Sequence, residues 1–70
     1  MNITAERLQR LIADDIDSVA QTLNKVLVDF GYSTTQTYVK EVIQKIQAGE
    51  KPLGGPASFI ANWIQKGIED

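Results

Sequence analysis

The first 30 residues contain neither glycine nor proline, and their apolar side chains recur with the spacing of an α-helix. At about 100° per residue, these positions fill about half of the helix circumference, which is the width of a face that packs on a globular core. They are Leu8, Leu11, Ile12, Ile16, Val19, Ala20, Leu23, Val26, Leu27 and Phe30. Gly31 follows as the expected C′ residue, because glycine readily takes the left-handed conformation that ends many helices. The N-terminal part is therefore predicted to be helical.

This apolar stripe can belong to one helix or to two. A single helix from Thr4 to Phe30 would be about 40 Å long, which outruns the other helices of so short a chain. Asp15 offers a break point, because its carboxylate can cap the first turn of a new helix. We predict two helices, at about residues 4–13 and 16–30. The unbroken phase of the stripe leaves one continuous helix as the alternative.

A further helix is predicted after the turn at Gly31. Ser33 and Gln36 have the spacing of a capping box, in which each side chain bonds to the backbone of the other residue. Beyond them, apolar residues again recur on one face until Gly49. The sequence therefore predicts a helix at about residues 34–48, which Gly49 closes.

The segment at residues 50–55 is the main loop, because its proline and two glycines disfavour regular structure. Leu53 is expected to pack into the core from this loop. Pro56 fits the first turn of a last helix, at about residues 56–68, where its missing N–H costs nothing. No alternation of period two indicates a strand. The predicted fold is all-α: a compact bundle of three or four short helices in a single domain, residues 1–70.

The inventory of reactive side chains argues against catalysis. Among its 70 residues the chain has no histidine and no cysteine, so the commonest general base and the strongest nucleophile are both missing. Asp14, Asp15 and Asp17 form the one acidic cluster, but it lacks the glycine and the downstream glutamate of an EF-hand loop. We interpret these aspartates as helix-capping residues. The sequence predicts no enzyme, cofactor, metal site or small-molecule ligand.

Charge and hydropathy limit the partners and the location. The formal net charge of −2 provides no overall positive field for nucleic acid or anionic lipid. No stretch approaches the roughly 18 apolar residues of a membrane span, and the N-terminus lacks the apolar run of a signal peptide. We expect a cytoplasmic protein without a membrane partner.

The last helix gives the leading functional hypothesis, because its apolar side chains cover about 200° of its circumference. Either this helix is surrounded by the others, or the edge with Phe59 and Trp63 projects and waits for a partner. Exposed aromatic side chains are common anchors of protein interfaces. The sequence therefore predicts a small protein-interaction module, with Phe59, Trp63 and Tyr32 in the contact. The partner is another protein or a second copy, and a homodimer is the simplest version.

DNA binding is the alternative. The short turn with Gly31 between two predicted helices resembles the helix-turn-helix of DNA-binding proteins, whose second helix enters the major groove. Thr37 and Lys40 depart from that motif, because they occupy positions that are normally apolar. The resemblance implies a regulator that contacts DNA with the helix after Gly31. Its outward polar residues are Gln36, Thr37, Lys40, Gln44 and Lys45.

Overall fold

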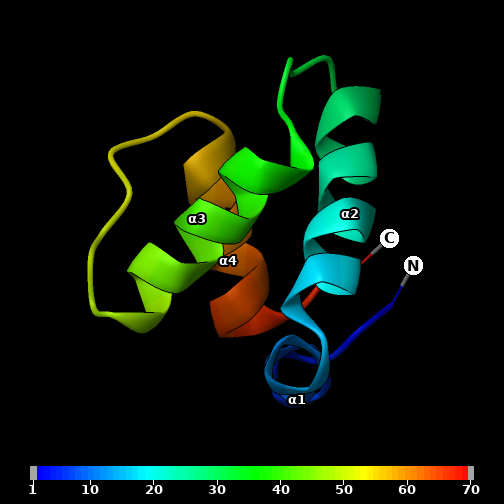
Figure 1. Ribbon diagram of the computed structural model, residues 1–70, viewed down its shortest axis with the longest axis vertical. Helices are drawn as coiled ribbons and strands as arrows, with labels where there is room; N and C mark the ends of the chain where they lie inside the picture. The colour runs from blue at the N-terminus through cyan, green and yellow to red at the C-terminus, as the bar shows by residue number, and fades with distance from the viewer. Residues whose placement is uncertain (1, 70) are drawn as a thin grey trace.

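The computed structural model describes residues 2–69, and this part of the chain contains four α-helices. They are α1 (Ala5–Asp14), α2 (Ile16–Asp29), α3 (Gln36–Gln47) and α4 (Pro56–Lys66). Figure 1 shows α1 end-on beneath an upright α2, with α3 and α4 beside α2. The predicted all-α bundle is confirmed. No helix within residues 2–69 is long and apolar enough to cross a membrane.

The chain breaks at Asp15, as the two-helix prediction requires. Asp15 leaves the helical conformation with φ −157° and ψ 85°. Its Oδ1 accepts a hydrogen bond of 3.2 Å from the Ser18 N–H, which satisfies one of the free donors at the start of α2. The break turns the chain sharply between α1 and α2, so the apolar stripes of both helices face one core (Figure 1).

Glycine ends α2 and α3 in the same way. Gly31 has φ 98° and donates its N–H to the Val28 carbonyl at 2.9 Å, while the Tyr32 N–H reaches the Leu27 carbonyl at 3.0 Å. These two bonds form a Schellman motif. Gly49, with φ 92°, closes α3 with the same pair of bonds. Both glycine positions were predicted from the sequence.

The start of α3 differs from the prediction. Thr35 is the N-cap, and its hydroxyl oxygen accepts a hydrogen bond of 3.1 Å from the Tyr38 N–H. Thr34 donates its hydroxyl to Asn24 Oδ1 at 2.6 Å, so the segment before the helix is tied to α2. The capping box predicted from Ser33 is therefore wrong, and α3 begins later than expected.

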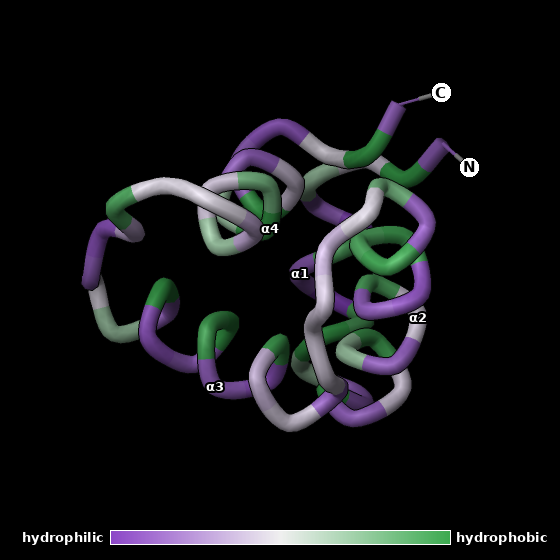
Figure 2. Tube along the Cα trace, turned by 90° about the horizontal axis from the view of Figure 1, so that it is seen from above, coloured by the Kyte–Doolittle hydropathy of each residue, from purple (hydrophilic) through white to green (hydrophobic). Residues whose placement is uncertain are grey.

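The core is apolar and receives side chains from all four helices. Figure 2 shows the apolar stretches of α3 turned toward the interior and its polar stretches turned outward. Within residues 2–69, the buried hydrophobic residues are Leu8, Ile12, Val19, Ala20, Leu23, Leu27, Val39, Val42, Ile43, Ile60, Trp63, Ile64 and Ile68.

The expectation that Leu53 packs into this core is wrong, because its side chain is fully exposed. Gly54 and Gly55 have φ values of 130° and 65° and turn the chain back toward α4 directly after Leu53. Leu53 therefore lies on the outside of the bend, and side chains from the helices fill the core instead.

The two ends of the described chain pair with each other. Ile3 and Ile68 form an isolated antiparallel bridge, with N–H to carbonyl distances of 2.9 and 2.7 Å. Gly67 packs so tightly against this segment that an added Cβ would lie 2.5 Å from the Ile3 carbonyl oxygen. From α1, Gln9 Nε2 donates to the Ile64 carbonyl at 2.9 Å. These contacts stop α4 at Lys66, before the predicted end.

Candidate interaction surface

Four aromatic side chains gather on one side of the bundle, and we call Phe30, Tyr32, Phe59 and Trp63 the aromatic patch. Phe59 is its centre, with ring centroids 5.7 Å from Phe30, 5.8 Å from Tyr32 and 6.0 Å from Trp63. Phe30 also lies 6.4 Å from Trp63. The rings are tilted or meet edge to face, which is the favourable geometry for aromatic pairs. The structure thus brings together Tyr32, Phe59 and Trp63, the three predicted contact residues.

The patch depends on how two helices end and begin. Phe30 is the C-cap of α2, so its ring extends past the last turn of that helix. The Schellman turn at Gly31 then folds the chain back and places Tyr32 beside the same surface. Phe59 follows closely on Pro56, the first residue of α4. The surface therefore forms where the C-terminus of α2 meets the N-terminus of α4.

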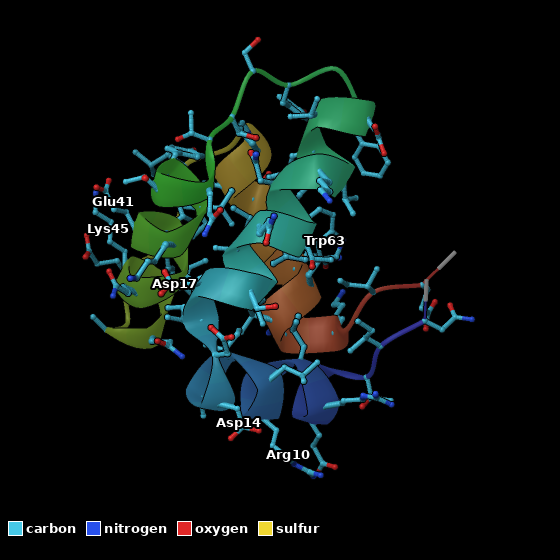
Figure 3. The ribbon with its side chains drawn as sticks, turned by 45° about the vertical axis from the view of Figure 1, so that its right-hand side comes forward. Arg10, Asp14, Asp17, Glu41, Lys45 and Trp63 are labelled. Carbon is cyan, nitrogen blue, oxygen red and sulfur yellow. The ribbon has the colours of Figure 1, made fainter. Side chains whose placement is uncertain are left out.

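Exposure divides the patch into a base and a rim. The Phe30 side chain is 58% exposed and the Phe59 side chain 37% exposed, whereas Trp63 is 6% exposed. Figure 3 shows Trp63 between α2 and α4. Trp63 therefore supports the patch from beneath, and Phe30 and Phe59 present their rings to solvent.

The wide apolar arc of α4 is divided between a buried face and one partly exposed edge. The helix packs against α1 and α3, and Ile60 and Ile64 are buried in the core. The outer edge at Phe59 stays partly exposed, because Phe30 and Tyr32 cover it only from one side. A helix that packs on two neighbours and has one partly open edge thus accounts for the arc.

Phe30 is the member of the patch that sequence reasoning missed as a contact residue. Its position in the apolar stripe of α2 predicts a core side chain. However, it directly precedes the glycine that ends the helix, and the last buried residue of α2 is Leu27. An aromatic residue at a helix C-cap, before Gly31, is the signal that could have found it.

The polar face of α3 meets α2 instead of pointing wholly into solvent. Lys40 Nζ forms an ion pair of 2.9 Å with Asp17 Oδ1, and Gln36 Nε2 donates to the Asp17 carbonyl at 3.1 Å. Figure 3 places Asp17 on the side of α2 that faces α3. Gln36 and Lys40, two of the candidate DNA-contacting residues, are therefore engaged within the molecule.

The remaining DNA candidates, Thr37, Gln44 and Lys45, are exposed. Figure 3 shows Glu41 beside Lys45 on the free side of α3. A carboxylate next to the one lysine of this group weakens the positive potential that a phosphate would meet. Of the five candidates, two therefore contact α2, and the other three lie on an exposed surface that carries both charges.

Comparison with protein-family models, with curated proteins and with solved structures found no match for this chain. Its function is therefore inferred from the geometry of its own surfaces.

Proposed function

We propose that this chain is a protein-interaction module that binds another protein chain, either a second copy or a different partner, through the aromatic patch. One observation carries the proposal: the rings of Phe30 and Phe59 lie side by side at 5.7 Å, both reached by solvent, on a base formed by buried Trp63. Adjoining exposed aromatic rings are typical anchors of protein interfaces, since their burial releases much apolar surface from water.

The exposed area of the two rings sets the size of the effect. A phenylalanine covers roughly 200 Å², so the exposed fractions of 58% and 37% correspond to roughly 190 Å² of apolar surface. Burial of that area contributes about 5 kcal/mol. Association costs are of similar size. The patch is therefore suited to be the centre of a contact. Residues around the patch must contribute further binding free energy.

Affinity capture with matched variants tests the proposal. The tagged wild-type chain, Phe30→Ala and Val28→Ala are used to capture partners, including an untagged copy of the chain, and the captured protein is purified and titrated. Val28 is the control, because it is 49% exposed but lies about 160° around α2 from Phe30. We expect Val28→Ala to bind like the wild type and Phe30→Ala to bind at least tenfold more weakly.

Two outcomes would contradict the proposal. One is equal affinity of all three forms for the captured protein. The other is a folded wild-type chain that captures neither a partner nor its own untagged copy. Circular dichroism checks that each variant is folded.

Duplex DNA binding through α3 is the competing hypothesis. No observation favours it over the patch, because Asp17 engages Gln36 and Lys40 and Glu41 adjoins Lys45. It predicts an affinity for duplex that falls steeply with salt. Titration of a labelled duplex at low and moderate salt separates the two hypotheses.

A further inference from the structure

The outer edge of α4 carries the patch at one end and a cation at the other. Asn62 and Trp63 lie three and four residues after Phe59, and Lys66 lies four and three residues after them, so the four side chains share a face of α4. Asn62 and Lys66 are exposed. Lys66 is the last residue of the helix. The edge is therefore apolar near the N-terminus of α4 and carries the Lys66 ammonium group at its C-terminus, where Glu69 lines the same hollow.

An acidic residue stands at the apolar end of this edge. Asp29 is exposed, ends α2 and directly precedes Phe30, whose ring packs on Phe59. A carboxylate at a helix C-terminus meets the negative end of the helix dipole, so a cation nearby is favourable there. Within residues 2–69, neither Asp29 nor Lys66 forms an ion pair.

This arrangement is complementary to itself. A two-fold axis perpendicular to α4 near Asn62 exchanges the two ends of its outer edge. It would place Lys66 of each copy next to Asp29 and Phe30 of the other copy. The Phe59 rings of the two copies would lie between the two ion pairs. We infer that the partner of the aromatic patch is a second copy of this chain, with the two α4 helices antiparallel and two symmetric Lys66–Asp29 ion pairs. The inference rests on the proposed function, since it takes the patch as the contact.

Size and composition also favour a second copy. A standard interface covers about 800 Å² of each partner, which is roughly a sixth of the 4650 Å² surface of this chain. The outer edge of α4, together with the patch, can form the centre of such an interface. No member of the patch is charged, so its burial desolvates no ion. A chain of 70 residues without cysteine or histidine can form neither a disulfide nor a zinc site with thiolate or imidazole ligands to reinforce its small core. Dimerisation supplies further apolar burial.

Sedimentation equilibrium of the purified chain across a wide concentration range, at low salt, tests the inference. The wild type, Lys66→Asp, Asp29→Lys and the double charge swap are compared. We expect a reversible wild-type dimer and a dissociation constant raised about tenfold by each single change, because two attractive pairs become repulsive. The double swap restores opposite charges across the axis, so its dissociation constant should return close to that of the wild type. Lys45→Asp on α3 is the control for charge and should dimerise like the wild type.

The outcomes separate this inference from the proposed function. A wild-type chain that stays monomeric at millimolar concentration overturns the inference that the partner is a second copy. The capture experiment then still decides whether the patch binds another protein. A dimer that Phe30→Ala dissociates, but on which the single charge changes have no effect, overturns the antiparallel arrangement of α4 and supports the patch. Failure of the double swap to restore dimerisation overturns the ion pairs. Circular dichroism of each variant shows that a loss of dimer is not a loss of fold.

Discussion

At its C-terminal end α4 is held by hydrogen bonds and close contacts to its backbone and to the residues that follow it, whereas at its N-terminal end it meets α2 through aromatic rings that solvent reaches. At the C-terminal end, Gln9 bonds the Ile64 carbonyl, Gly67 lies against the N-terminal segment, and Ile3 pairs with Ile68. At the N-terminal end, the cap residue of α4 is a glycine without a side-chain hydrogen bond, and the neighbouring contacts are between rings.

The difference indicates how stability and binding divide along one short helix. The backbone groups of Ile3, Ile64 and Ile68 at the C-terminal end already have partners within the chain, so a second protein would gain little by covering them. Apolar rings at the N-terminal end remain in water, and a partner can remove that area from water. Substitutions at the backbone contacts of the C-terminal end, such as those of Gly67, should therefore change folding alone, and substitutions of the exposed rings should change association as well.

The largest effect on stability is expected from Gly67→Ala. The backbone there has φ 88°, and a Cβ would lie 2.5 Å from the Ile3 carbonyl oxygen, which cannot rotate away as a flexible side chain could. We expect a loss of about 3 kcal/mol in the free energy of unfolding, measured by urea denaturation. Gly49→Ala is the control, because Gly49 has φ 92° but nothing within 4 Å of the added Cβ. Equal losses in the two variants would show that the close contact with Ile3 does not matter.

An intermediate effect is expected from Phe30→Ala, because this ring at the end of α2 packs against Phe59 near the N-terminus of α4. The buried part of the ring contributes about 1.5 kcal/mol to stability, about half of the loss expected for Gly67→Ala. The same substitution should weaken association at least tenfold, whereas Gly67→Ala should leave association of the folded fraction unchanged. Sedimentation and urea denaturation of both variants measure the two effects. If Gly67→Ala impaired association as strongly as Phe30→Ala, the proposed division would be wrong.

A smaller effect is expected from Gln9→Met, which keeps the length of the side chain and removes its donor. The Ile64 carbonyl then loses its partly buried hydrogen bond, and we expect a loss of about 1 kcal/mol. Gln44→Met is the matched control, because Gln44 is exposed on α3. Thermal unfolding followed by circular dichroism compares the stability of the two variants. Equal stability would show that the Gln9 hydrogen bond does not help to hold α4.

The smallest effect is expected from Leu53→Ser. This side chain is fully exposed, and surface substitutions of this kind stay within about 0.5 kcal/mol. Urea denaturation should give the same midpoint as for the wild type. A loss above about 1 kcal/mol would mean that Leu53 packs in solution, and that exposed apolar side chains outside the patch also carry stability.

The helices were predictable because local chemistry determines where they begin and end. Asp15 can cap a helix and cannot comfortably continue an apolar stripe, so it marks the break between α1 and α2. Gly31 and Pro56 act through backbone conformation alone, which requires no knowledge of the rest of the fold. The patch residues on α4 were predictable for a related reason, since an apolar arc too wide for a peripheral helix shows in the sequence itself.

The contacts between distant segments were not predictable. Nothing in the sequence near Ile3 or Ile68 indicates that they pair, because a single bridge has no alternating pattern. Phe30 joined the patch because α4 passes beside the end of α2, which periodicity cannot show. The start of α3 was misplaced because Thr35 caps the helix in place of Ser33, and Thr34 bonds across the turn to Asn24.

The pairing of Ile3 with Ile68 also bears on folding kinetics. It joins segments near the two ends of the described chain, so nearly the whole polypeptide must be ordered before the pair forms. The α2–α3 pair needs only a short turn and can form early. We therefore expect the terminal bridge to be absent from the folding transition state. Changes at the bridge should speed unfolding and leave the folding rate unaltered, so the bridge would set the lifetime of the native state.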